Sequence, residues 1–416
     1  MAEALEERDT RSRHTLTVSL LLVRILALVT NAAVARLIGK ADYGAAGATL
    51  AFGSLVAVPL SAIQWAVTRQ VSTAPRDHYM LRRLSAAVYA GAATMLLGGV
   101  AAAGLADHAL HLHGVWPSTL LGLFLAAVLV EGIPIGVLIG EGRFRYVSVC
   151  VLVGATLKIA ISVIWGALHP NVIGPLAGAG ISEFITALAL TVPIASRLFR
   201  RQGEQHISFS EVWLSMAGTT GLLAIMSIDT IAARHWLTGP ASGLYAVASA
   251  LGSGVFFVSS SAIAARYADV SRGAAQGQSR AFWVGLTEVA GLAVITCGVL
   301  VLAAPLAIRI VFGAQYGGAR SALIVLSFSY ALLGVLSYLV NHLLAHRTRA
   351  ILLPWIGTAV LTALVFLRHG DTVAIASDAL LASATIFLAI LLVSVRLERR
   401  PRIHLHLVVP EEELLR

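Results

Sequence analysis

Charged residues are scarce in this chain of 416 residues: 12% are charged, 58% are hydrophobic, and only two are lysines. The mean hydropathy is +0.84, which is far more apolar character than a soluble domain needs. The two cysteines both lie in apolar stretches, so a disulfide framework is not expected. Backbone groups in lipid must be satisfied within their own segment. The sequence therefore predicts an all-α, polytopic membrane protein.

Enzyme motifs are missing as well. The chain has no Walker A loop, no HExxH, no G-x-S-x-G elbow and no long external loop with clustered carboxylates. We therefore expect no enzyme, no catalytic residue and no cofactor. Asp107, His108, His111 and His113 have a spacing that a metal ion would accept, but a solvated loop is favoured and no metal is predicted. The net charge of +9 is explained by basic loops on one side of the membrane, so it does not indicate nucleic-acid binding.

Apolar runs of about 20 residues, the length that crosses a bilayer, recur twelve times along the chain. The expected spans are 16–38, 44–67, 84–105, 119–140, 146–168, 172–195, 212–236, 242–264, 281–303, 321–344, 351–367 and 374–395. With both termini in the cytoplasm, 22 of the 30 Lys and Arg residues fall on the cytoplasmic side. This bias predicts the orientation of the chain in its membrane. The scarcity of lysine beside arginine is typical of a GC-rich bacterial genome, so the expected location is a bacterial inner membrane.

The chain is predicted to be built twice. Gly44 to Ser54 and Gly243 to Ser253 both read G-x8-G-S, and a basic R-x-R loop follows the fourth and tenth spans. A parallel repeat of six plus six spans is a common plan for transporters. The expected units are a cytoplasmic lead 1–14, a six-helix bundle 15–196, a cytoplasmic linker 197–210, a second six-helix bundle 211–396 and a cytoplasmic tail 397–416.

Ionisable side chains inside spans are costly and usually face a cavity or a partner. The predicted substrate-binding residues are Arg24, Glu131, Lys158, Glu183, Asp229, Arg234 and Glu288. Arg24 and Lys158 suit an anionic head group, because Arg donates two parallel hydrogen bonds and Lys adds a point charge. The alternatives are structural pairs: Arg24 with Glu131, Lys158 with Glu183, and Asp229 with Arg234 or a neighbouring helix.

Four stretches resemble a known family. They are ARLIGKADYG (35–44), GRFRY (142–146), IDTIAARHWLTGPASGLYAVASAL (228–251) and PLAIRIVFGAQYGGA (305–319). In this order they resemble the polysaccharide-transporter branch of the multidrug/oligosaccharidyl-lipid/polysaccharide exporter superfamily. The resemblance implies two six-helix bundles, alternating access and an undecaprenyl-diphosphate-linked oligosaccharide as cargo. Twelve spans differ from the fourteen of lipid II flippases, and Arg24 and Lys158 favour an anionic cargo.

The sequence therefore predicts a flippase that carries a lipid-linked oligosaccharide, or a related polysaccharide precursor, from the cytoplasmic to the outer leaflet. Its partners would be the anionic cargo, membrane lipids and enzymes of glycan biosynthesis, with no nucleic acid. Two alternatives stay open. One is a multidrug-type small-molecule antiporter of the same superfamily, and the other is a non-transporting scaffold of a glycan assembly complex.

Overall fold

The chain is α-helical in the computed structural model, which describes residues 2–73, 81–112, 114–198, 210–276, 279–346, 348–368 and 370–399. These residues contain no strand. The helices are α1 (Ala2–Leu60), α2 (Ala62–Thr73), α3 (Arg82–Ala101), α4 (Ala103–Leu110), α5 (Trp116–Gly140), α6 (Phe144–Leu168), α7 (Ile173–Thr191), α8 (Ala195–Leu198), α9 (Ser210–Trp236), α10 (Gly239–Gln276), α11 (Ser279–Val311), α12 (Arg320–Ala345), α13 (Pro354–Arg368) and α14 (Thr372–Arg399). Three 3₁₀ turns, η1 (Val192–Ile194), η2 (Ala314–Ala319) and η3 (Arg349–Leu352), complete the described structure.

Eleven helical segments of the described chain are long and apolar enough to cross a membrane. The first of them runs over 51 residues, Leu22–Ser72, which is about twice the length of one span. Gly39 divides it, with φ 79° and ψ 172°. This backbone conformation lies in a region that favours glycine. The division yields the twelve spans that the sequence predicts.

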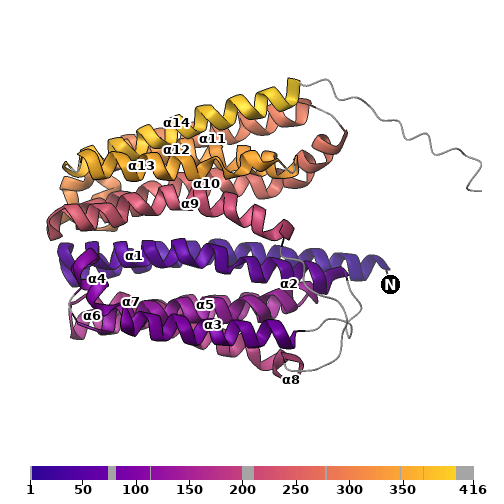
Figure 1. Ribbon diagram of the computed structural model, residues 1–416, viewed down its shortest axis with the longest axis horizontal. Helices are drawn as coiled ribbons and strands as arrows, with labels where there is room; N and C mark the ends of the chain where they lie inside the picture. Colours follow the sequence, from indigo (N-terminus) through magenta and orange to yellow (C-terminus); the bar gives the residue numbers. More distant parts are fainter. Residues whose placement is uncertain are drawn as a thin grey trace, which may run out of the picture.

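The spans form two bundles, α1–α8 and α9–α14, which lie one above the other in Figure 1. The same helix pairs touch in both bundles. The contacts α1·α6, α2·α5, α3·α5, α5·α7 and α6·α7 correspond to α9·α13, α10·α12, α11·α12, α12·α14 and α13·α14. The predicted duplication of a six-helix unit is therefore confirmed in the packing. The exact unit boundaries stay a prediction, and most of the expected linker, 199–209, lies outside the described residues.

Several helices are longer than the sequence predicts. Only Gly39 interrupts the helix in the expected turn 39–43, and α10 continues to Gln276 through much of the expected polar loop 266–280. Helix α11 includes Pro305 and ends at Val311, and α4 occupies part of the expected loop 106–118. A polar stretch shows where a helix leaves the apolar layer of the membrane. It does not end the helix, because the backbone hydrogen bonds continue through it.

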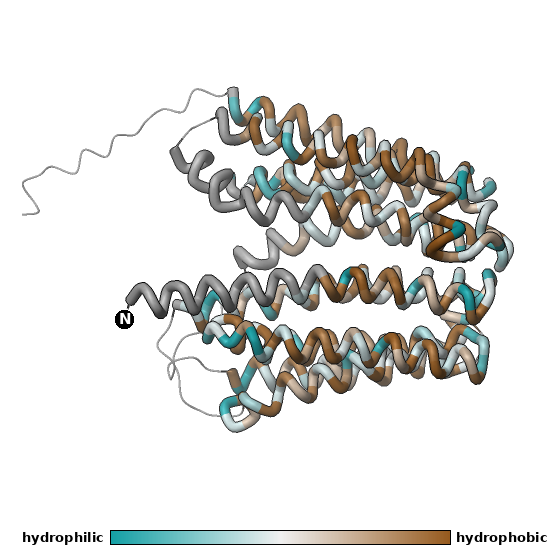
Figure 2. The backbone as a smooth tube through the Cα atoms, turned by 180° about the vertical axis from the view of Figure 1, so that it is seen from behind, coloured by the Kyte–Doolittle hydropathy of each residue, from teal (hydrophilic) through white to brown (hydrophobic). Residues whose placement is uncertain are grey.

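Apolar side chains cover the outside of both bundles. Leu302, Leu367 and Val192 are 85%, 79% and 73% exposed, as expected for residues that face lipid. Figure 2 shows hydrophobic stretches along the helices of both bundles, with hydrophilic positions mainly toward the two ends. The end that contains Gly39 is called here the Gly39 end. The N-terminus lies at the opposite end (Figure 1).

The two bundles meet closely at the Gly39 end. A Cβ atom placed on Gly243 would lie 2.0 Å from the carbonyl oxygen of Lys40, and one placed on Gly44 would lie 2.7 Å from the amide nitrogen of Gly243. Tyr316 donates a hydrogen bond of 2.7 Å to the carbonyl oxygen of Ala35. We call this contact region the joint.

Candidate functional site: a polar cavity at the interface of the bundles

A cavity of about 320 Å³ lies between the two bundles. Its walls come from α1, α5, α6 and α7 on one side and from α9, α10 and α12 on the other. Its polar lining residues are Thr30, Asn31, Tyr43, Ser54, Lys158, Ser162, Ser227, Thr230, Ser249, Ser253 and Tyr330. Val34 and Tyr43 belong both to this lining and to the apolar core that joins the bundles. The joint therefore forms the wall of the cavity toward the Gly39 end.

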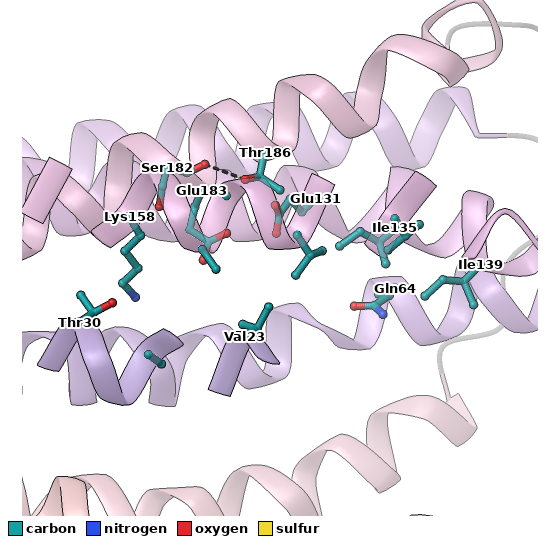
Figure 3. Close-up of a pocket in the computed structure, with 15 residues that line it drawn as sticks. Val23, Thr30, Gln64, Glu131, Ile135, Ile139, Lys158, Ser182, Glu183 and Thr186 are labelled. Carbon is teal, nitrogen blue, oxygen red and sulfur yellow. Dashed lines mark hydrogen bonds between the residues drawn. The ribbon is translucent and has the colours of Figure 1, made fainter. Parts of the chain in front are cut away.

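A second cavity of about 310 Å³ lies inside the first bundle, and it shares Ala27, Thr30 and Lys158 with the first cavity. Glu131 on α5, Lys158 on α6 and Glu183 on α7 all line it. Figure 3 shows Glu183 between Lys158 and Glu131, with the Lys158 chain extending toward Thr30 on α1. The two cavities are therefore neighbours, and together they make up the candidate site.

The three charges in this second cavity come close enough to influence one another. Glu183 interacts electrostatically with both Lys158 and Glu131. Neither carboxylate forms an ion pair with Lys158 within the described part of the chain, and Oε1 of Glu131 is buried with no hydrogen-bond donor. The predicted alternative of a closed Lys158–Glu183 pair is therefore not what the structure contains. Glu131 and Lys158 instead both line the second cavity.

Arg24 lies on α1 beside the cavity between the bundles. Its side chain is exposed, and its guanidinium carbon lies 4.1 Å from the ring centroid of Phe257 on α10. Phe257 lines the cavity. An Arg over an aromatic face makes a cation–π contact and still presents N–H donors at its edge. The alternative pairing of Arg24 with Glu131 does not occur in the structure.

Asp229 is buried behind the cavity wall and accepts hydrogen bonds from its neighbours. The Tyr245 hydroxyl donates to Oδ2 at 2.9 Å, and the backbone N–H of Thr230 donates to Oδ1 at 2.6 Å. The Thr230 hydroxyl also lies 3.1 Å from Ser249, whose hydroxyl lies 2.7 Å from that of Tyr330. This network connects Asp229 to cavity-lining hydroxyls on two other helices.

Arg234 has different partners from those considered in the sequence analysis. Its guanidinium donates to the carbonyl oxygens of Leu110 (2.8 Å), His111 (3.2 Å) and Ala41 (3.3 Å), and it lies 3.4 Å from the Ser242 hydroxyl. Three of these four groups belong to the first bundle, whereas Arg234 is in the second. Arg234 therefore ties the bundles together at the Gly39 end and does not pair with Asp229.

Glu288 is the remaining predicted site residue. It lies on α11 with an exposed side chain, and α11 does not contribute to either cavity. The structure therefore brings Glu131, Lys158 and Glu183 together, and places Arg24 and Asp229 at the border of the cavity. It separates Arg234 and Glu288 from it. Substrate binding by any of these residues stays a prediction.

Sequence reasoning did not identify the neutral polar members of the site. Gln64 lines the second cavity, and Thr30, Ser249 and Tyr330 line the first. Hydroxyl and amide groups in a span carry a weaker signal than charges do, because they often bond to the preceding helical turn. The G-x8-G-S repeat could have drawn attention to Ser54 and Ser253, which both line the first cavity.

No protein-family model matches this sequence, and a comparison with curated proteins finds no match either. Solved structures do match. The chain has the fold of transporters of the MOP superfamily. It is similar to the lipid II flippase MurJ in an inward closed conformation, with a TM-score of 0.72, 14% identity, and coverage of 92% of this chain and 87% of MurJ.

The fold also resembles multidrug transporters. An inward-facing MATE family transporter of the MOP superfamily matches with a TM-score of 0.60 and 13% identity, covering 94% of this chain and 100% of that one. A mutant of the Vibrio cholerae MATE transporter VcmN matches with a TM-score of 0.62 and 15% identity, covering 95% and 98%. At these identities the similarity establishes the fold alone. The matched structures include a lipid II flippase and multidrug resistance transporters.

Proposed function

We propose that this chain is a flippase that moves a polyprenyl-diphosphate-linked oligosaccharide, or a related polysaccharide precursor, from the cytoplasmic to the outer leaflet. The observation that carries this proposal is the placement of Lys158, whose side chain lines both cavities without an ion pair to the nearby carboxylates. The diphosphate would meet Lys158 and Arg24, the sugar would occupy the hydroxyl-lined space, and the prenyl chain would stay in lipid.

Alternating access would require the joint to separate while the opposite end closes. In the predicted orientation the Gly39 end faces outward, because, of the basic residues that the structure describes, it holds only Arg36, Lys40, Arg234, Arg309, Arg320 and Arg368. An outward-moving negative charge gains about 2.3 kcal/mol per 100 mV across an inside-negative membrane. The membrane potential would therefore favour outward movement of a diphosphate.

A multidrug-type antiporter is the second candidate, and the two carboxylates of the second cavity favour it. Glu131 and Glu183 line the same space as Lys158, and a carboxylate that borders a cavity can bind a cation or carry a proton. In the flippase these same groups would serve a coupling ion. The two candidates therefore differ in the sign of the cargo charge.

The test is leaflet translocation of a lipid-diphosphate oligosaccharide in proteoliposomes, with an imposed membrane potential. Wild type would be compared with Arg24→Ala/Lys158→Ala. Arg145→Ala serves as the matched control, because Arg145 is an exposed cation on the same helix as Lys158 and lies outside both cavities. Correct insertion and folding would be checked by size-exclusion chromatography and protease protection.

We expect wild type and the Arg145 control to translocate the lipid at equal rates, and the double variant to lose most of the activity. Translocation that survives in the double variant would reject Arg24 and Lys158 as the head-group site. No translocation by wild type, together with efflux of cationic dyes, would favour the antiporter. Absence of both activities would favour a scaffold.

A further inference from the structure

Three side chains with metal-ligating groups converge at the end of the second bundle that lies opposite the Gly39 end, and none of them lines either cavity. His342 and His346 lie at the end of α12, and Glu398 lies near the end of α14. One ligand atom from each lies within 4.8 Å of the others. The end of α14 lies on the same side of the molecule as the N-terminus (Figure 1).

We propose that His342, His346 and Glu398 form a binding site for a divalent transition-metal ion, of which Zn²⁺ is the best fit. Two imidazole nitrogens and one carboxylate oxygen are ligands that zinc accepts, and three protein ligands leave a fourth position for water. His342 lies in the last turn of α12 and His346 is the C-cap residue four positions further on, a spacing that places both side chains on the same face and that zinc sites use.

Two of the three distances between the ligand atoms match those around a zinc ion. Nε2 of His342 and Nε2 of His346 lie 3.3 Å and 3.5 Å from the same carboxylate oxygen, Oε1 of Glu398. In a tetrahedral site with bonds of about 2.0–2.1 Å, neighbouring ligand atoms are about 3.3–3.4 Å apart. An N–H···O hydrogen bond has its most common length near 2.9–3.0 Å. The spacing is therefore better suited to a shared ion than to direct hydrogen bonds.

The surroundings hold these ligands in place. The side chains of His342, Glu398 and His346 are 1%, 8% and 15% exposed, and buried charges are usually paired or coordinate a metal. The ring of Phe282, at the start of α11, lies 4.4 Å from that of His342, and the two imidazoles lie 4.5 Å apart. Packing of this kind holds the ligand side chains in one rotamer, so that binding an ion costs them less conformational entropy.

The first bundle joins the equivalent helix ends in another way. Glu141, which caps α5, forms an ion pair with Arg197 on α8, directly after α7. Helices α5 and α7 correspond to α12 and α14 in the repeat. The junction in the first bundle thus contains an Arg–Glu ion pair, whereas the junction in the second brings two imidazoles to one carboxylate, and all three of these groups can ligate metals. A bound ion would connect α12 to α14, just as the ion pair connects α5 to α8.

The experiment measures Zn²⁺ bound per chain by equilibrium dialysis and metal analysis. The full chain would carry no affinity tag and would be treated with a chelator beforehand. His404→Ala/His406→Ala forms the background, so that the tail histidines do not contribute. In that background we would compare His346→Ala and Glu398→Ala with His169→Ala, an exposed histidine outside the cluster. His342→Ala is informative only if it folds, because His342 is almost fully buried.

We expect one Zn²⁺ per chain and a higher melting temperature with Zn²⁺ than without it. His346→Ala and Glu398→Ala should each weaken binding by more than the roughly 10–100-fold cost of removing a supporting partner, while His169→Ala should not change it. Co²⁺ in the site should give visible absorption that both cluster variants lose. Wild type that binds no Zn²⁺, or binding that persists in both variants, would overturn the proposal. The lipid-translocation assay tests none of this, so the two proposals fail independently.

Discussion

Gly44 and Gly243 pack backbone against backbone where the two bundles meet, although they are 199 positions apart in the chain. They are also the first glycines of the two copies of G-x8-G-S. The repeat therefore brings equivalent positions of the two bundles into direct contact. Small residues at such a position let helices approach closely in a membrane.

Gly243→Ala is expected to weaken the joint. The new methyl group would lie 2.0 Å from the Lys40 carbonyl oxygen, so backbone must move. Overpacking typically costs about 1–3 kcal/mol, which corresponds to a shift of roughly 5–150-fold in a two-state equilibrium. The measurement is labelling of Ala46→Cys, a buried position that lines the cavity between the bundles, by a membrane-impermeant maleimide, with Cys150 and Cys297 replaced by serine.

Gly254→Ala is the matched control for this prediction, because Gly254 lies on the same helix and a Cβ there meets nothing within 4 Å. Labelling should rise in the Gly243 variant and stay at the wild-type rate in the control. Equal labelling in all three proteins would mean that the joint does not limit opening.

Arg234→Lys should also loosen the joint. A lysine ammonium cannot reproduce the fork that reaches Leu110, His111 and Ala41 at once. Hydrogen bonds to a charged group contribute about 1.5–3 kcal/mol each, so we expect a lower melting temperature and faster labelling of Ala46→Cys, which is buried. If Arg234 binds cargo instead, the variant would change the apparent KM for translocation and leave labelling unchanged.

Tyr245→Phe is expected to destabilise the second bundle. The hydroxyl donates to Oδ2 of Asp229 in a buried site, and a buried acceptor that loses its donor costs about 1–3 kcal/mol. Thermal unfolding in detergent should show a lower midpoint than for wild type. Tyr245→Phe/Asp229→Asn would restore part of the loss, because a neutral amide is cheaper to bury than a carboxylate. An unchanged midpoint in the single variant would contradict the prediction.

Glu183→Gln separates the two cargo classes by the sign of its effect. Glu183 shares the second cavity with Lys158, so removing its negative charge should strengthen binding of an anionic cargo. At about 1 kcal/mol for a nearby charge in a partly solvated site, the gain would be roughly fivefold. A cationic cargo would instead bind about fivefold more weakly.

Competition binding with a polyprenyl diphosphate and with a cationic dye measures both affinities on the same protein preparation. Gln64→Glu is the complementary variant, because Gln64 lines the same cavity and the change adds a negative charge. Its effects should be opposite in sign to those of Glu183→Gln. Two variants that change affinity in the same direction would exclude a simple charge effect.

Much of this fold is predictable from composition and charge. Apolar runs give the twelve spans and the repeated G-x8-G-S gives the duplication, whereas the orientation that the arginine bias indicates stays a prediction. Glu131, Lys158 and Glu183 stand out as charges inside spans, and the structure gathers them around one cavity. The span and site predictions succeed because a polar group in lipid is costly unless it has a partner. A charged residue inside an apolar run is therefore easy to recognise in the sequence.

Other features depend on which helix faces meet in three dimensions. Asp229 and Arg234 are five residues apart, which made a local pair plausible, yet Asp229 accepts from Tyr245 and Arg234 donates to the first bundle. His346 and Glu398 are 52 positions apart in the chain, and only the packing of α14 beside α12 brings them together. The sequence by itself determined how many times the chain crosses the membrane and where it repeats, because those properties follow from local hydropathy. Tertiary structure alone decided which buried polar groups share a partner, because those contacts join segments that are distant in the chain.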